Sequence, residues 1–177
     1  MARLVIPEYT AQEIIGALAK KLVWSGSKEL VIPNFYAPGW WECDLLAVTR
    51  AGYTSEYEIK ISRADFKVDS KKMTRSYRGS DKYKHQALSR LDEPSPNYFW
   101  YVMPIDLVPL PDIPEWAGVM WARWQSTRIR ILTVRQAPRL WKTKPDQQKL
   151  RNKMLKSFYH RYWQLYWGHL PKEGVDV

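Results

Sequence analysis

A pattern of charged residues inside a β-type run constrains this chain most. The segment TSEYEIKIS, residues 54–62, mixes β-branched and aromatic residues with three charged ones. In a strand, side chains two positions apart point to the same side of the sheet. One face therefore carries Glu56, Glu58, Lys60 and Ser62, and the other carries Tyr57, Ile59 and Ile61. The charged face is either the solvated side of an amphipathic strand or a reaction centre.

A neighbouring strand supplies another carboxylate. The segment WWECDLLAV, residues 40–48, is apolar on both faces beyond Asp44, which predicts a strand covered on both sides of a sheet. A turn at Ala51 and Gly52 joins it to the charged strand, and an antiparallel pairing can bring Asp44 close to Glu58. Two carboxylates beside a lysine, here Lys60, form a site for Mg²⁺, which prefers oxygen ligands. This convergence favours the reaction centre.

The remaining segments predict a chain that alternates helices and strands. Thr10 and Glu13 form a capping box before a helix over residues 11–24, and Ser62 and Asp65 predict a helix from Arg63. Further strands are expected at residues 29–36, 97–104, 117–124 and 128–134, and a helix from about residue 80. Residues 67–78 are basic and lack an apolar period, which indicates a mobile loop or a poorly anchored helix. One long helix is expected from about residue 146 to 169.

Length and charge limit the class of protein. A chain of 177 residues without a clear linker predicts one domain, residues 1–145, with residues 146–177 as a helical extension packed on or beside it. A net charge of +10 favours DNA or another polyanion as partner, although it could serve solubility alone. Cys43 is the only cysteine, which excludes an intramolecular disulfide. With no signal peptide or membrane span evident, we expect a cytoplasmic protein, without a membrane partner, in a bacterial or phage-infected cell.

The motif Asp44 followed by Glu58-Ile59-Lys60 resembles that of the PD-(D/E)XK nuclease superfamily. The wider segments EIKISRADFKVD, KYKH, NYFWYVMP, IPEWAGVMW and VRQAPRLWKTK resemble MmcB-type DNA-repair nucleases and related small phage and bacterial proteins. The similarity spans roughly residues 13–145. Cys43 stands where the superfamily often has a proline before the first acid.

This resemblance implies an α/β (α+β) fold with a restriction-endonuclease-like core: a mixed sheet of about four central strands flanked by helices, plus the long C-terminal helix. It implies Mg²⁺ or Mn²⁺ held by Asp44, Glu58 and the Ile59 carbonyl, with Lys60 as the catalytic lysine. Glu13 matches an acidic residue that some branches of the superfamily use for the metal. Accessory positions are Lys84, His85, Gln86 and Ser62. The expected activity is metal-dependent hydrolysis of DNA in repair, recombination or phage DNA processing.

Two basic surfaces follow the charged strand in the sequence. The first is predicted to be a loop that binds the phosphates of the DNA backbone without reading bases. It consists of Lys67, Lys71, Lys72, Arg75, Arg78 and Lys82. Its alternative is a solvated charge run. The last helix combines basic residues with an aromatic stripe, and it could pack on the domain, form a homodimer or bind DNA. A non-catalytic nucleic-acid-binding or adaptor protein on the same fold is the alternative function.

Overall fold

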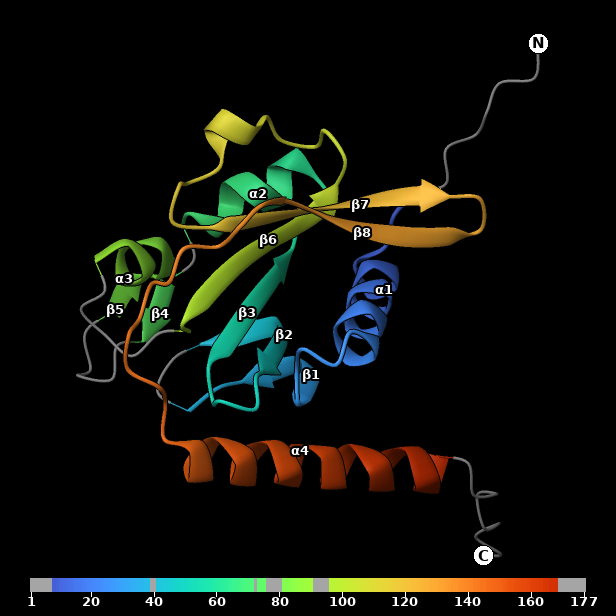
Figure 1. Ribbon diagram of the computed structural model, residues 1–177, viewed down its shortest axis with the longest axis vertical. Coiled ribbons are helices and arrows are strands. Elements are labelled where there is room, and N and C mark those ends of the chain that lie inside the picture. The colour runs from blue at the N-terminus through green and yellow to red at the C-terminus, as the bar shows by residue number, and fades with distance from the viewer. Residues whose placement is uncertain (1–7, 39–40, 72, 76–80, 91–95, 169–177) are drawn as a thin grey trace, which may run out of the picture. The chain divides into compact units, whose positions relative to one another are not determined.

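The computed structural model of the chain describes residues 8–38, 41–71, 73–75, 81–90 and 96–168 (Figure 1). The chain forms two compact units, residues 1–145 and residues 146–177. The first unit is a mixed α/β domain built on a six-stranded sheet in the order β1-β2-β3-β6-β7-β8. Its strands are β1 (Leu30–Tyr36), β2 (Glu42–Val48), β3 (Thr54–Ile59), β6 (Tyr98–Pro104), β7 (Gly118–Gln125) and β8 (Arg128–Arg135).

The sheet joins two antiparallel hairpins through a parallel centre. β2 runs antiparallel to β1 and β3, and β8 runs antiparallel to β7. β3, β6 and β7 are parallel to their neighbours at the centre. Parallel neighbours need a long crossover connection, and the segment between β3 and β6 supplies one. It contains α2 (Arg63–Asp69), β4 (Met73–Arg75), β5 (Asp81–Tyr83) and α3 (Lys84–Arg90).

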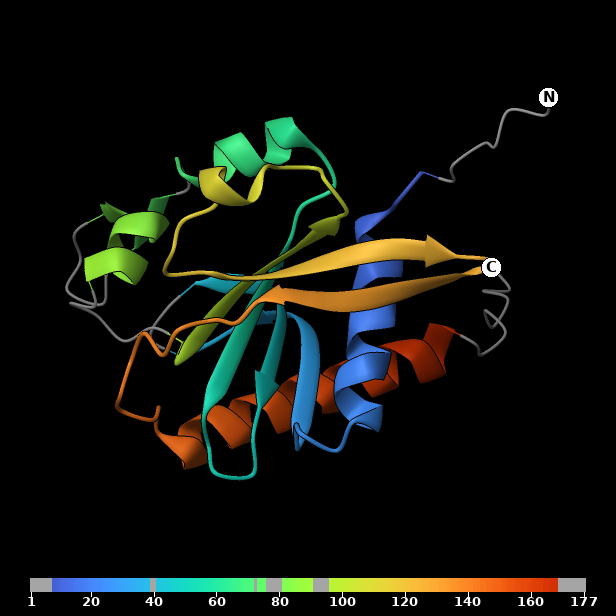
Figure 2. The ribbon, with the colours of Figure 1, turned by 45° about the horizontal axis from the view of Figure 1, so that its top comes forward.

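Helix α1 (Ala11–Trp24) covers one face of the sheet (Figure 2). The predicted capping box is present, because the Thr10 hydroxyl accepts from the Glu13 N–H and the Glu13 carboxylate accepts from the Thr10 N–H. The apolar side of α1 packs in one core cluster with alternate residues of the strands. This cluster includes Ile14, Leu18, Leu45, Ala47, Tyr57, Ile59, Trp100, Val102, Met120 and Ala122.

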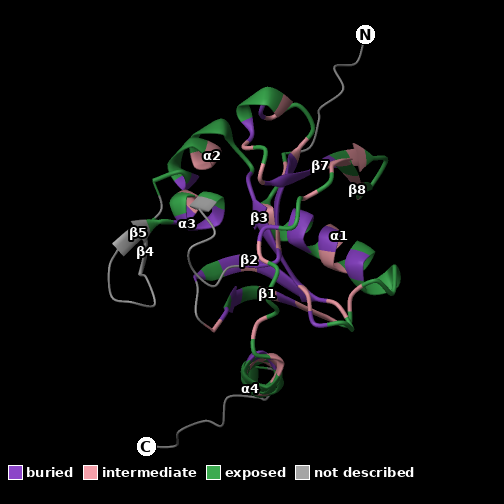
Figure 3. Ribbon diagram, turned by 60° about the vertical axis from the view of Figure 1, so that its left-hand side comes forward, coloured by how far each residue is buried: buried purple, intermediate pink, exposed green. Residues whose placement is uncertain are grey.

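The opposite face of the sheet lies under α2, α3 and the β6–β7 connection, which contains the 3₁₀ turn η1 (Leu110–Asp112) (Figures 1 and 2). Because side chains alternate, β3 presents Glu56 and Glu58 to this face while Tyr57 joins the α1 core. All six residues of β3 are buried, as the purple strand in Figure 3 shows. The two carboxylates therefore lie in the interior.

The sequence predictions hold for most elements and fail only in part of the segment between β3 and β6. The helix at 11–24, the helix from Arg63, the strands and the long last helix are confirmed. The prediction of about four central strands was too low, since the sheet has six. Residues 73–75 and 81–83 pair as a two-stranded sheet, where a loop or helix was expected, and α3 begins at Lys84 rather than near Ser80. Strands of three residues are too short to show the alternation of polar and apolar side chains by which a strand is predicted from sequence.

The second unit contains α4 (Gln147–Gly168). Its N-terminus is capped, since Asp146 Oδ1 accepts from the Lys149 N–H at 3.0 Å. Aromatic side chains one turn apart contact each other along its last turns, including Tyr162 with Tyr166 and Trp163 with Trp167. Within the described part of the chain, none of the helices combines the length and apolar character needed to cross a membrane.

Candidate functional site

The strands β2 and β3 separate at the predicted acidic pair. Their pairing ends at Leu45 and Tyr57, and Asp44 and Glu58 are the next residues in register. There the Asp44 side chain replaces the backbone ladder, because its Oδ2 accepts from the Ile59 N–H at 2.7 Å. The half-buried Asp44 carboxylate is thus fixed at the end of β3, beside the motif Glu58-Ile59-Lys60.

Two lysines hold the Glu58 carboxylate. Lys60 Nζ lies 3.0 Å from Glu58 Oε1, and Lys84 Nζ lies 2.8 Å from Glu58 Oε2. Glu58, Lys60 and Lys84 are 2%, 1% and 3% exposed, respectively. The interpretation of this face as the solvated side of an amphipathic strand is therefore wrong. α2, α3 and their connections cover it.

Glu56 extends the buried network from the same face of β3. Lys84 Nζ lies 2.8 Å from Glu56 Oε1, and the Trp41 indole N–H donates to both Glu56 oxygens at 2.8 and 2.9 Å. Burial raises the pKa of Glu56 to about 7, with a further rise from the Glu58 charge that Lys84 partly offsets. Burial lowers the pKa of Lys84, but the charges of Glu56 and Glu58 outweigh it and hold the pKa above its usual range. Lys84 is therefore a fixed cation between two carboxylates.

Asp69, the last residue of α2, forms the second centre of the network. Its Oδ1 lies 2.9 Å from Lys60 Nζ, while its Oδ2 accepts from the Tyr101 hydroxyl at 2.7 Å and lies 2.9 Å from His85 Nε2. Burial alone would raise the pKa of Asp69, but the hydrogen bond with His85 and the charges of Lys84 and Lys60 hold it well below its usual value. Asp69 is therefore a buried carboxylate that stays ionised.

The network connects the interior to the surface. His85 Nε2 is 2.8 Å from the Tyr101 hydroxyl, and the His85 side chain is 19% exposed. Burial and the Asp69 charge raise the pKa of Tyr101, so its hydroxyl remains a proton donor. Contacts run in sequence from Glu58 through Lys60 and Asp69 to His85. Such a series of contacts can hold the Lys60 ammonium in a fixed position beside the Glu58 carboxylate.

The structure brings some predicted residues together and leaves others apart. Lys84 and His85 of α3 join Glu58 and Lys60 in one network. Gln86 is exposed, and the Ser62 hydroxyl caps α2 by accepting from the Asp65 N–H. Glu13 belongs to α1, on the face of the sheet opposite the network, and its carboxylate is engaged by Thr10.

The basic residues predicted to bind DNA are described only in part. Lys67 and Lys71 are exposed, at and just beyond the end of α2. Lys72 and Arg78 lie outside the described residues, as do the side chains of Arg75 and Lys82.

Three residues of the network were not among the predicted site residues: Trp41, Asp69 and Tyr101. Glu56 was placed on the charged face but given no role. Tyr101 occupies the position paired with Glu58 on β6. The sequence shows that Tyr101 shares one face of its strand with Phe99 and Met103, but nothing in the sequence identified β6 as the neighbour of β3.

The residues present fit a hard cation in donor type, since Asp44, Glu58 and the Ile59 carbonyl all offer oxygen. They are not arranged as a complete site. Among the described residues, no group of three or more His, Cys, Asp or Glu side chains could hold a metal ion together. Each Glu58 oxygen already contacts a lysine. A cation at Asp44 and Glu58 would therefore require Lys60 or Lys84 to release one oxygen.

Comparisons with known proteins show the fold alone. No family model and no curated protein matches the chain. Among solved structures, the SPO1766 protein of unknown function from Silicibacter pomeroyi is similar with a TM-score of 0.64 and 20% sequence identity. The similarity covers 97% of this chain and 99% of that one. A natural protein of comparable length thus shares this arrangement of helices and strands.

Proposed function

We propose that the chain is a metal-dependent phosphodiesterase that hydrolyses DNA, with a restriction-endonuclease-like core of the PD-(D/E)XK type. One observation carries the proposal. The Asp44 carboxylate is fixed by the Ile59 N–H at the point where β2 and β3 separate, beside Glu58 and Lys60. Acid, acid and lysine thus come from two adjacent strand ends. The net charge of +10 supports a polyanionic substrate.

Asp44, Glu58 and the Ile59 carbonyl would hold Mg²⁺ or Mn²⁺ in this proposal. Such an ion polarises a phosphodiester oxygen and lowers the pKa of bound water. The rest of the chemistry belongs to the chain. Lys60 would exchange one carboxylate partner for a phosphoryl oxygen and stabilise the charge that develops there. Asp69, 2.9 Å from Lys60 Nζ, would keep this ammonium charged and in place.

The test uses a variant that keeps the local hydrogen bond. Asp44→Asn retains an oxygen that can accept from the Ile59 N–H but removes the charge that a metal requires. Purified protein is incubated with duplex, single-stranded and branched DNA and each metal, and Mn²⁺ binding is measured by calorimetry. We expect Mn²⁺ binding and cleavage in the wild type and loss of both in Asp44→Asn. Asp106→Asn, an exposed residue of the β6–β7 connection, is the matched control.

One observation favours the alternative of a non-catalytic nucleic-acid-binding or adaptor protein. Both Glu58 oxygens are paired with buried lysines, which is also how a purely structural ion network would be built. DNA binding without Mn²⁺ binding, and without cleavage, would support this alternative. Cleavage that persists unchanged in Asp44→Asn would contradict the proposed centre.

A further inference from the structure

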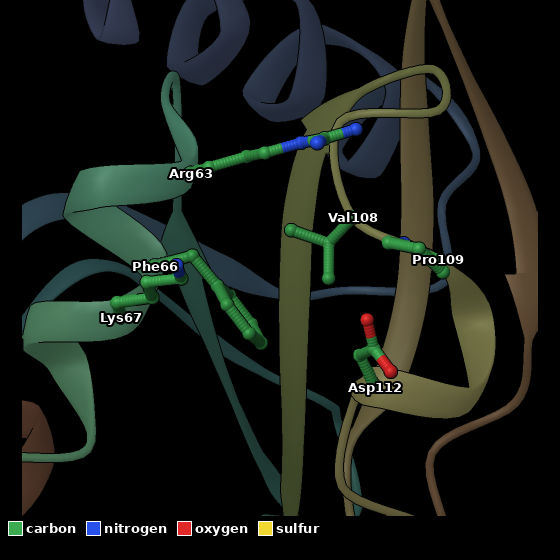
Figure 4. A pocket seen from close by; sticks show the side chains of 6 residues that line it. All are labelled: Arg63, Phe66, Lys67, Val108, Pro109 and Asp112. Carbon is green, nitrogen blue, oxygen red and sulfur yellow. The ribbon is translucent and has the colours of Figure 1, made fainter.

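A groove of about 420 Å³ lies between α2 and the β6–β7 connection (Figure 4). It is next to the candidate centre formed by Asp44, Glu58 and Lys60. Its residues are Arg63, Phe66 and Lys67 of α2 and Val108, Pro109 and Asp112 of the connection. Phe66 points its ring into the space, and Val108 and Pro109 form the opposite wall. The groove therefore offers an apolar slot with charged groups at its edges.

The charged edges differ in their bonding. Arg63 bridges the two sides, because its Nε–H donates to the Leu107 carbonyl at 2.7 Å. For the Lys67 ammonium and the Asp112 carboxylate, the described residues provide no partner. An apolar slot with a free cation on one side and a free anion on the other suits a flat, amphipathic ligand that also carries a phosphate.

The groove is directly connected to the candidate centre. The Phe66 ring lies edge-on to the Tyr101 ring at 5.1 Å, and the Tyr101 hydroxyl binds Asp69, the partner of Lys60. Asp65, the residue before Phe66, places a carboxylate oxygen 3.6 Å from Lys60 Nζ. A strand whose phosphate reached Lys60, once this lysine, now 1% exposed, became accessible, would therefore have a neighbouring nucleotide at the groove.

We propose that this groove holds one unpaired base of a nucleic-acid strand. The base stacks on Phe66, Lys67 pairs with a flanking phosphate, and Asp112 accepts from an exocyclic amino group. A base within a duplex cannot enter, so the groove selects single-stranded or locally opened DNA. The inference rests on the proposed function only in that the same strand reaches Lys60. It adds the substrate class, a strand with an unpaired base.

Binding is tested without turnover, in EDTA, with the full chain and short fluorescein-labelled oligonucleotides read by anisotropy. We expect single strands to bind more tightly than duplex of equal length. Phe66→Ala should weaken single-strand binding roughly 5- to 140-fold, because stacking of one base on an aromatic ring contributes about 1–3 kcal/mol. Duplex binding should stay within about twofold, since the backbone contacts remain. Val68→Ala is the matched control, because Val68 is 58% exposed on the same helix and does not line the groove.

Asp112 provides a second test that does not disturb the core, because this residue is exposed. Carboxylates accept from the cytosine amino group, which thymine lacks. The wild type should prefer oligo-dC over oligo-dT, and Asp112→Asn should reduce that ratio. If Phe66→Ala fails to fold, as thermal unfolding would show, the ratio of oligo-dC to oligo-dT affinity in Asp112→Asn decides the question.

The outcomes separate this inference from the proposed function. Unchanged single-strand affinity in a folded Phe66→Ala, an equal loss on duplex, or no binding of single strands by the wild type overturns the groove, whatever the cleavage assay gives. A selective loss in Phe66→Ala without cleavage by any metal supports the groove and contradicts the nuclease. If cleavage is lost in Asp44→Asn while Phe66→Ala binds like the wild type, the nuclease is supported and the base-binding role of the groove is contradicted.

Discussion

The Lys60 ammonium lies 2.9 Å from the Asp69 carboxylate, although these side chains are only 1% and 0% exposed. Lys60 directly follows β3 and Asp69 is the last residue of α2, so their pairing ties the crossover connection to the sheet. Removing two charges from water costs several kcal/mol per ion unless geometry and further hydrogen bonds compensate. The Tyr101 hydroxyl, His85 and Glu58 supply those further contacts.

Lys84 should be the most sensitive position of the network. Lys84→Met leaves Glu56 and Glu58 buried without their shared cation, and we expect a loss of about 3–5 kcal/mol in the free energy of unfolding. Urea denaturation followed by tryptophan fluorescence measures it. Lys71→Met, at an exposed position, should change stability by no more than about 0.5 kcal/mol. A change of that small size in Lys84→Met would contradict the ion pairs of Lys84 with Glu56 and Glu58.

Glu56 should make stability depend on pH. Its pKa is raised from 4.5 to about 7 in the folded chain, so between these values the folded state binds more protons than the unfolded state. Stability from this group is therefore present below pH 4.5 and declines as the pH rises through 7. Glu56→Gln, which cannot ionise, isolates the effect.

Urea unfolding of wild type and Glu56→Gln at a series of pH values from 5 to 8, in EDTA, gives the difference in stability. The wild type should lose stability relative to Glu56→Gln as the pH rises. A difference that stays constant over this range would show that Glu56 is ionised in the folded state throughout.

The sequence predicted the elements whose apolar pattern extends over many residues, and the contacts between elements joined by short connections. The helix at 11–24 shows its apolar spacing, and the turn at Ala51 and Gly52 allowed Asp44 to be placed near Glu58. Burial of the charged face could not be predicted in this way. It depends on α2 and α3 folding over β3, and on Tyr101 becoming the parallel neighbour of Glu58 across a long crossover.

Local pattern also gave Asp69 no distinguishing feature. It lies in a basic, polar stretch whose short strands show no period, so the end of α2 could not be placed from the sequence. Its partners Lys60, His85 and Tyr101 are 9, 16 and 32 residues away, respectively. Only the folded crossover brings these side chains together.

Gly118 and Gly16 should respond in opposite ways to alanine. A Cβ at Gly118 would collide with the Trp100 ring and lie 2.7 Å from the Ala137 backbone nitrogen, whereas at Gly16 it would meet nothing within 4 Å. Gly118→Ala should therefore cost about 1–3 kcal/mol of stability, as overpacking does. Gly16→Ala, within α1, should stabilise by about 0.5–1 kcal/mol. Thermal unfolding of both variants checks the pair, and equal effects would contradict the close packing of β7 on Trp100.

The basic end of α2 should determine how DNA affinity depends on salt. Lys67 and Lys71 are exposed, so replacing both with alanine should remove up to two counterion-release events without unfolding the domain. The slope of log affinity against log salt should become shallower by about 0.9 per lost contact on duplex DNA, or about 0.7 on a single strand. Affinity should fall alike for every sequence, because phosphate contacts read no bases.

Lys20→Ala, an exposed residue of α1 on the other face of the sheet, should leave the slope unchanged. An unaltered slope in the double variant would mean that these lysines form only a solvated face, and the DNA would then have to be bound by other basic residues, such as Lys149 and Lys156 of α4.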